Sequence, residues 1–314
     1  MDRFLLQLML TKGIGTIAIK KIINFVKDNP KYSFELLCYN PQIISKVLIN
    51  YKNLQDIIDN VHLNYNAAER LFESLKEKNI KGIIETDISY PAQLKHTLGK
   101  NCPPVLFAKG NYDLLYTKAV GFCGSRKVSE KGSAITAQCA SQLVDEGITV
   151  VSGYASGTDM SAHVSAMKNG GNTVFVLAEG ILRYKEKTMV RDYIKSTNHV
   201  FISQFLPNAL WNVGNAMARN SIVLGLSQAM ILVESGKKGG TFAAGEESLK
   251  KGVPLFVIDY AQPEVSAEAN PYFISRGGFP IRSKNGTPNL DKVFHFVNSD
   301  ANNCHFEQLD LEFG

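Results

Sequence analysis

The chain has 314 residues, of which 45% are hydrophobic and 20% charged, so it can bury one substantial core and a smaller second one. Its 34 Lys and Arg residues only slightly outnumber its 29 Asp and Glu residues, and a formal charge of +5 gives weak overall attraction for nucleic acid. A site for a polyanion would therefore need local clustering of basic side chains.

The five cysteines are widely spaced and contain no C-x-x-C pair, which argues against a zinc site or a disulfide framework. A reduced, cytoplasmic compartment fits this pattern best. The first apolar run is too short for a signal peptide, and no segment reaches the roughly 18 uninterrupted apolar residues of a membrane span. We expect no membrane partner.

The first part of the chain has helical periodicity. Phe4, Leu5 and Leu8 share one face of a predicted helix, and similar spacing continues to about residue 78. We expect a small all-α domain over residues 1–78. The turn around Gly13 and Gly15 resembles a helix-hairpin-helix, which can donate backbone N–H groups to a DNA phosphate; it can equally be a tight turn between two helices.

A connector containing Pro91, Pro103 and Pro104 leads to a short strand, Val105–Phe107, after which strands and helices alternate. Such alternation predicts an α/β fold with a Rossmann-like, mainly parallel sheet flanked by helices. We expect this domain, with its connector, over residues 79–297, and a short acidic tail over 298–314. The predicted strands are 119–123, 148–152, 172–177, 230–233 and 254–258, and the predicted helices are 129–146, 159–169 and 241–251.

Three strand-to-helix loops, residues 124–129, 152–159 and 236–241, combine glycine with hydroxyl side chains. Glycine lets a ligand approach the backbone, and the helix that follows turns its positive end toward the loop, which suits phosphate oxygens. A parallel sheet brings such loops to one edge, although each loop alone could be only a tight turn. The predicted phosphate-binding residues are Gly124, Ser125, Arg126, Lys127, Ser152, Gly153, Gly157, Lys237, Lys238, Gly239, Gly240 and Thr241.

Arg219 and Asn220 precede an apolar run and are predicted to line the same edge; the alternative is a solvated helix start. Asp159 and His163 lie four apart on a predicted helix, but no third metal ligand lies nearby, so we expect a helix cap and a buried, hydrogen-bonded histidine. The chain has neither G-x-x-x-x-G-K-[ST] nor G-x-G-x-x-G. We expect no catalytic residues, metal or cofactor.

Together these residues resemble the DNA-processing protein A family, also called DprA or Smf. Their order and spacing hold from about Leu5 to Phe294. The matching motifs are Tyr90-Pro91-x-x-Leu94, Pro103-Pro104 to Gly110-Asn111, Gly124-Ser125-Arg126, Val150 to His163, Gly170 to Leu177, Arg219-Asn220, Gly252 to Val257 and Asn270 to Gly278.

The resemblance implies a non-catalytic protein that binds single-stranded DNA in a basic pocket, forms a homodimer and delivers the strand to a RecA-type recombinase. It implies that Ser125, Arg126, Arg219 and Asn220 contact the DNA backbone and that the turn at Gly240 contributes backbone donors. The chain also departs from the family. Ser221 replaces a second arginine, residues 178–185 have lost most of a family motif, and no winged helix is recognisable after Val297.

Two other functions remain open at this point. Gly239-Gly240-Thr241 resembles part of the signature of phosphoribohydrolases, which favours a nucleotide-binding or nucleotide-sensing protein; Ala244 stands where those enzymes carry a glutamate, so hydrolysis is not expected. The second is a protein-interaction module in which the pocket is vestigial.

Overall fold

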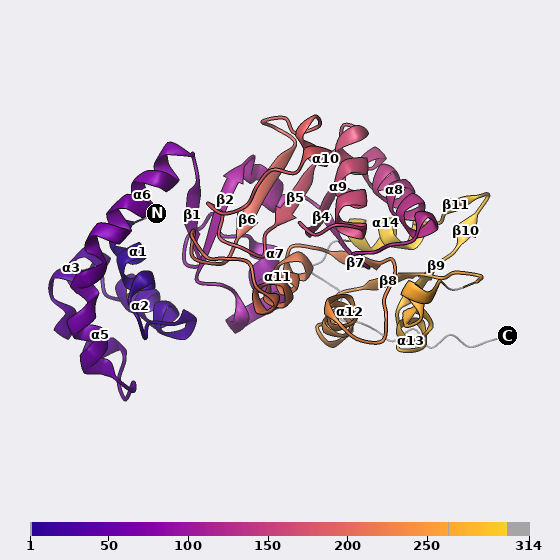
Figure 1. The fold of residues 1–314 in the computed structure, drawn as a ribbon. Coiled ribbons are helices and arrows are strands. Elements are labelled where there is room, and N and C mark those ends of the chain that lie inside the picture. Colours follow the sequence, from indigo (N-terminus) through magenta and orange to yellow (C-terminus); the bar gives the residue numbers. More distant parts are fainter. Residues whose placement is uncertain (1, 263, 300–314) are drawn as a thin grey trace.

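A computed structural model describes residues 2–262 and 264–299 of the chain. Residues 2–77 form a helical lobe beside the sheet (Figure 1). Leu5, Leu8 and Ile22 are fully buried within it, which confirms the helical faces predicted from the sequence. The division into domains at residue 78 stays a prediction. The helices of the lobe are α1 (Arg3–Leu10), α2 (Thr16–Asp28), α3 (Phe34–Tyr39), α4 (Ile44–Val47), α5 (Leu54–Asn60) and α6 (Tyr65–Glu77).

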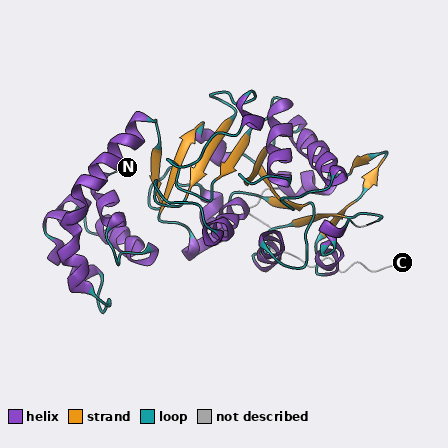
Figure 2. Ribbon diagram, viewed as in Figure 1, coloured by secondary structure: helices purple, strands orange, loops and turns teal. Residues whose placement is uncertain are grey.

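A nine-stranded sheet forms the centre of the rest of the molecule, in the order β1-β2-β6-β5-β4-β3-β7-β8-β9 (Figure 2). All pairs from β6 to β9 are parallel, whereas β2 runs antiparallel to both of its neighbours. The predicted mainly parallel, Rossmann-like sheet is confirmed. The strands are β1 (Lys81–Ile84), β2 (Val105–Gly110), β3 (Ala119–Cys123), β4 (Thr149–Gly153), β5 (Thr173–Val176), β6 (His199–Ser203), β7 (Ala229–Leu232), β8 (Leu255–Ile258) and β9 (Phe279–Ile281), with a separate hairpin of β10 (Ser283–Lys284) and β11 (Thr287–Pro288).

Helices cover both faces of the sheet, and each face has its own hydrophobic cluster. One cluster packs Phe122 and Phe256 against α8 (Glu130–Asp145), α9 (Thr158–Lys168) and α14 (Asp291–Asn298). The other packs Leu106 and Leu232 against α7 (Ala92–Leu98), α11 (Val213–Gly225) and α13 (Asn270–Ser275). The remaining helices are α10 (Thr188–Arg191), which contacts α9, and α12 (Gly240–Lys250), which packs on α11. Both faces of the strands are therefore buried, as is usual for parallel sheets.

The order of the strands changes direction at β3. From β3 the chain adds β4, β5 and β6 on one side, and it later returns to place β7 and β8 on the other. The helices that follow β3 and β7 consequently contribute to opposite faces, and the loops at the carboxyl ends of these two strands diverge. This divergence leaves a crevice where open α/β sheets usually bind ligands.

Cys38, Cys102 and Cys139 are buried as free thiols, as expected of small core residues, and Cys123 is partly exposed. Cys304 and all of the predicted acidic tail beyond Ser299 lie outside the described residues. In the part of the chain that the structure describes, no helix combines the length and apolar character needed to cross a membrane.

Candidate functional site

A cleft of about 440 Å³, the central cleft, lies at this crevice. It brings together the loops after β3 and β7, the start of α12 and one side of α11. The sequence prediction that these loops share one edge of the sheet is thus confirmed in their geometry. The predicted residues that line the central cleft are Gly124, Ser125, Arg126, Arg219, Asn220, Lys238, Gly239, Gly240 and Thr241.

Hydrogen bonds hold the loops of the central cleft against one another. The hydroxyl of Thr241 donates to the carbonyl of Gly124 at 2.9 Å, and the amide of Asn220 donates to the carbonyl of Gly240 at 3.2 Å. Gly157 has a φ of +78°, and a β-carbon there would meet the carbonyl oxygens of Ser125 and Arg126. Glycine is required at this position because both the conformation and the close approach exclude a side chain.

Arg219 lies at the base of the central cleft with only 7% of its side chain exposed. Its Nη1 lies 3.4 Å from Oδ2 of Asp159, a long contact for an ion pair. Its Nε is buried, and within residues 2–262 and 264–299 it has no hydrogen-bond acceptor. A buried donor without a partner is costly, and the guanidinium that carries it brings a positive charge to the base of the cleft, which favours an anionic ligand.

Ser152 and Gly153 begin the predicted phosphate-binding loop of residues 152–159, but their surroundings favour a supporting role. The buried hydroxyl of Ser152 lies within hydrogen-bonding distance of both the carbonyl of Phe122 and the carboxylate of Asp159, at 2.8 and 3.0 Å. A β-carbon on Gly153 would lie 1.2 Å from Nη1 of Arg219. Both residues are buried, Gly153 against the guanidinium and Ser152 against Asp159, which favours a supporting role; their contact with phosphate stays a prediction.

Asp159 is not the cap of α9, because Gly157 occupies the N-cap position. Its carboxylate instead accepts hydrogen bonds from Ser152 and from the backbone N–H of Ala155, and it pairs with Arg219. A metal role for Asp159 is therefore unnecessary to explain its position.

His163 is fully buried, as predicted from its place on α9. Its Nε2 donates to the carbonyl of Gly153 at 2.7 Å, and its Nδ1 lies 2.6 Å from the hydroxyl of Thr173. Burial lowers the pKa of His163 to about 4, so the ring is neutral at pH 7. A neutral ring with both nitrogens bonded explains this histidine as a structural residue.

A second cleft of about 410 Å³, the side cleft, adjoins the central cleft and shares Arg126, Trp211 and Arg219 with it. Three further basic residues line it, Arg183, Lys185 and Lys187. Sequence reasoning missed these three, because the segment that carries them stood out only as a departure from a family motif.

Lys187 lies deepest of these three side chains. Its Nζ donates to the carbonyl of Tyr154 at 2.6 Å and lies 4.6 Å from the centre of that residue's ring. Burial lowers the pKa of Lys187, although Asp159 and Glu179 oppose the shift. The lysine thus orders the floor of the side cleft.

Trp211, the single tryptophan of the chain, borders both clefts and is half exposed. The guanidinium carbon of Arg126 lies 5.8 Å from its ring centroid, within the range of a cation–π contact. Leu210 and Val213 beside it are also exposed. Sequence reasoning missed this aromatic surface; a lone tryptophan in the loop before α11 was the available signal.

Two predicted lysines are absent from the residues that line the clefts. Lys237 forms an exposed ion pair with Glu268 at 3.4 Å, and Lys127 is exposed beyond the rim. Ser221, which stands where the family has arginine, donates to Glu247 at 3.0 Å. The basic residues that line the clefts therefore differ from the predicted set. Lys127 and Lys237 are outside the lining, whereas Arg183, Lys185 and Lys187 are part of it.

Glu234 is a fully buried carboxylate at the end of β7. It accepts hydrogen bonds from the backbone and the hydroxyl of Ser129, which begins α8, and from Tyr260 and Ser266. This carboxylate therefore fixes the start of α8, and with it the loop from Gly124, relative to β7.

The family model for DNA recombination-mediator protein A matches residues 81–285, well over half of the chain. The chain belongs to this family. The resemblance seen in the sequence is confirmed. One relative is the DNA processing protein DprA of Streptococcus pneumoniae, which is 32% identical to this chain over 174 residues. The match covers 55% of this chain and 60% of that protein, less than two thirds of its length.

Two solved structures of the family share the fold. The crystal structure of DprA from Streptococcus pneumoniae has a TM-score of 0.75 at 24% identity and covers 90% of this chain and 95% of that chain. DprA from Helicobacter pylori, whose structure is described for its unique single-stranded DNA binding mode, has a TM-score of 0.56 at 21% identity. That match covers 70% of this chain and 94% of the other.

Proposed function

We propose that the two clefts bind single-stranded DNA and that the protein acts on it by binding rather than by catalysis. The observation that carries the proposal is Arg219, a buried guanidinium whose Nε has no acceptor among the described residues and which lines both clefts. The positive charge of this guanidinium at the base of both clefts suits a phosphate group. Membership of a recombination-mediator family and the binding mode described for the Helicobacter pylori relative support the same ligand.

The charges that line the clefts favour a polyanion. The six cationic residues are Arg126, Arg183, Lys185, Lys187, Arg219 and Lys238, and the three carboxylates are Asp159, Glu179 and Glu234. The excess of positive charge is local, since the chain as a whole carries only +5. Exposed Trp211 beside Arg126 offers a stacking surface for unpaired bases, which a duplex does not present.

Fluorescence anisotropy of a labelled oligo-dT, titrated at several salt concentrations, tests the proposal. If about three phosphates are neutralised, log affinity should fall against log salt with a slope near −2, at ~0.7 per contact in single strands. Arg126→Ala should weaken binding and reduce the slope by one contact, whereas Lys127→Ala, an exposed neighbour outside the clefts, should change little. Unchanged affinity and slope in Arg126→Ala would overturn the assignment.

Trp211 provides an independent readout, because the chain has no other tryptophan. Oligo-dT should change its emission over the same concentration range as the anisotropy, and a duplex of equal length should bind more weakly. Emission that does not respond while anisotropy rises would place the strand outside these clefts.

The nucleotide alternative makes a different prediction at the central cleft. Its volume of about 440 Å³ suits a single nucleotide, and Gly240 and Thr241 begin α12 within it. Ala244, rather than a glutamate, lines the cleft beyond that turn. Nucleoside monophosphates should therefore release no free base on chromatography. Strong competition of these monophosphates with oligo-dT would favour the nucleotide alternative, whereas weak competition would favour single-stranded DNA.

We further propose, from the family, a homodimer and a RecA-type recombinase as partners. Size-exclusion chromatography with light scattering tests the homodimer. Co-elution of the protein with the recombinase in the presence of oligo-dT tests the recombinase as a partner. A monomer at all concentrations, or separate elution, would remove these partners from the proposal.

A further inference from the structure

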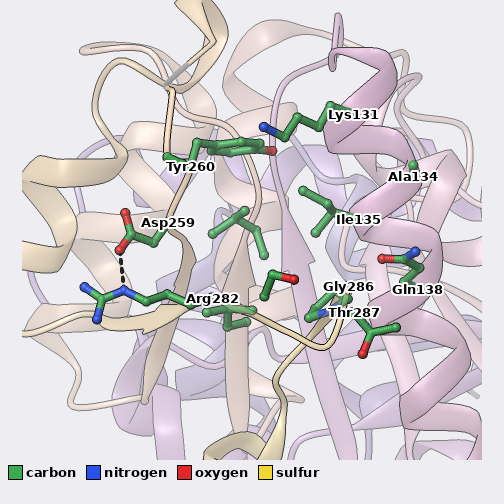
Figure 3. Close-up of a pocket in the computed structure, with 14 residues that line it drawn as sticks. Lys131, Ala134, Ile135, Gln138, Asp259, Tyr260, Arg282, Gly286 and Thr287 are labelled. Carbon is green, nitrogen blue, oxygen red and sulfur yellow. Dashed lines mark hydrogen bonds and ion pairs between the residues drawn. The ribbon is translucent and has the colours of Figure 1, made fainter.

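A third cavity, of about 510 Å³, lies at the carboxyl ends of β8 and β9. It shares no lining residue with the central or side cleft. Figure 3 shows its walls: α8 on one side, the ends of β8 and β9 on the other, and the β10–β11 hairpin closing one end. Nothing in the proposed DNA-binding function uses this cavity.

The floor of the cavity is apolar. Ile258, Ile281 and Pro288 are buried beneath it, and Ile135 of α8 forms part of the opposite wall. The volume falls within the range of roughly 300–1,000 Å³ that is typical of small-molecule sites. An apolar floor of this size favours a ligand with a flat or aliphatic body.

The charged residues at the rim leave one unpaired positive charge. Nε of Arg282 lies 2.8 Å from Oδ2 of Asp259, so these two charges cancel (Figure 3). Nζ of Lys131 lies 5.5 Å from the ring centroid of Tyr260, and none of the ion pairs formed by residues 2–262 and 264–299 includes this lysine.

Tyr260 contributes no charge of its own. Its hydroxyl donates to Glu234 at 3.3 Å, and burial together with that carboxylate raises the pKa of the phenol. The ring thus presents an aromatic surface with the ammonium group of Lys131 beside it.

We propose that this cavity is a second ligand site, which binds a small organic monoanion with a flat apolar body. The body packs on the floor formed by Ile258 and Ile281, and the anionic group meets Lys131. The site is independent of the DNA-binding proposal and stands on the cavity, its apolar floor and its unpaired cation.

Two fluorescent probes that share one ring system test both halves of the proposal. 8-Anilinonaphthalene-1-sulfonate carries one negative charge, and N-phenyl-1-naphthylamine carries none. Titrated into the full chain, both should fluoresce on binding. Ala134→Phe and Gln138→Phe, placed on successive turns of α8 at the cavity wall, should each weaken both probes, because the new rings fill the space.

The charge is tested separately. Lys131→Ala should weaken the sulfonate about two- to fivefold, the range of a partly exposed ion pair, and leave the uncharged probe unchanged. Lys27→Ala, an exposed lysine on α2, and Trp211→Ala, at the clefts, should alter neither titration. Circular dichroism and melting temperature verify that each variant is folded.

Identical titrations in the unaltered chain and in both filling variants would place the probes elsewhere and overturn the site. Equal effects of Lys131→Ala on both probes, or no effect on either, would overturn the anionic ligand. Because Ala134 and Gln138 are both exposed, at least one filling variant should fold.

Discussion

At the scale of single residues, the candidate site depends on one glycine beneath one arginine. Gly153 ends β4, and a β-carbon there would lie 1.2 Å from Nη1 and 2.0 Å from the guanidinium carbon of Arg219. The absence of a side chain is therefore what allows the guanidinium to lie across the end of the strand. Asp159 then holds it there by an ion pair.

Gly153→Ala should displace the Arg219 guanidinium, and we expect it to cost about 1–3 kcal/mol of stability, as in other overpacked sites. Affinity for oligo-dT should fall as well, because the guanidinium moves from its place at the base of the clefts. Urea denaturation and anisotropy measure the two effects. Gly15→Ala is the matched control, since a β-carbon on Gly15 would meet no atom within 4 Å and the φ of this residue is −90°. Normal affinity in Gly153→Ala would show that Arg219 does not contact the strand.

The sequence predicted some residues of the site for a clear physical reason. Gly124 to Arg126 and Gly239 to Thr241 follow parallel strands, and the topology must bring such loops to one edge. Ser152 could not be assigned in the same way, because only the structure shows that its hydroxyl is directed to Phe122 and Asp159. Trp211 lies in a loop whose path no periodicity specifies.

At the scale of elements, the start of α8 is coupled to β7 through Glu234. Its buried carboxylate accepts from Ser129 at the N-cap of α8, from Tyr260 after β8 and from Ser266 in the short turn Val265–Ala267. The helix begins immediately after the loop that carries Ser125 and Arg126. This single side chain therefore aligns three segments that are distant in the sequence.

Glu234→Ala should leave these hydroxyl donors without an acceptor and destabilise the protein by about 3 kcal/mol. Affinity for oligo-dT should fall in the surviving folded fraction, because the loop before α8 loses its anchor. Glu268→Ala, an exposed carboxylate near the same edge, should change stability by less than about 0.5 kcal/mol. Equal denaturation midpoints for the two variants would contradict this role for Glu234.

The elements themselves were predicted unevenly. β3, β4, β5, β7 and β8 were recognised because each is an apolar run that leads into a loop or helix with glycine or polar residues. β1, β6 and β9 were missed; β9 has only three residues and β1 four, too few to establish a periodicity. β6 is fully buried, but its polar ends, His199 and Ser203, obscured its apolar centre.

At the scale of the whole molecule, stability should depend on pH through buried histidine. Burial lowers the pKa of His163 to about 4 and also lowers the pKa of His199. Unfolding returns each ring to its ordinary pKa of roughly 6.5, so below that pH the unfolded chain binds more protons than the folded one. The contribution of these two rings to the free energy of unfolding is then complete above pH 6.5 and is lost as the pH falls toward 4.

The free energy of unfolding should accordingly decrease between pH 6.5 and 5, with a contribution from each histidine of up to roughly 1.4 kcal/mol per pH unit. Urea denaturation at a series of pH values measures the slope. His163→Gln keeps a donor for the carbonyl of Gly153. The variant should reduce the slope of the free energy of unfolding against pH by the contribution of His163. An unchanged slope in the variant would assign the pH dependence to other groups.

The helical lobe and the sheet are in contact as well as adjacent. Lys20 of α2 pairs with Glu85 at 3.0 Å and donates to the carbonyl of Lys100 at 2.9 Å. One hydrophobic cluster includes Leu5 of the lobe and Phe107 of β2. We propose that residues 1–78 nevertheless form a domain of their own, which expression of that segment and circular dichroism would test.

The bond between Thr241 and Gly124 joins positions 117 residues apart. During translation the ribosome synthesises β3 and its basic loop long before α12 emerges, so a nascent chain displays Arg126 before Thr241 can hold the loop at Gly124. A polypeptide cut short before Gly240 would retain the six basic residues of the two clefts but would lack the Thr241 hydroxyl that holds the loop at Gly124. The central cleft should thus reach its final geometry late in synthesis, when α12 packs on α11.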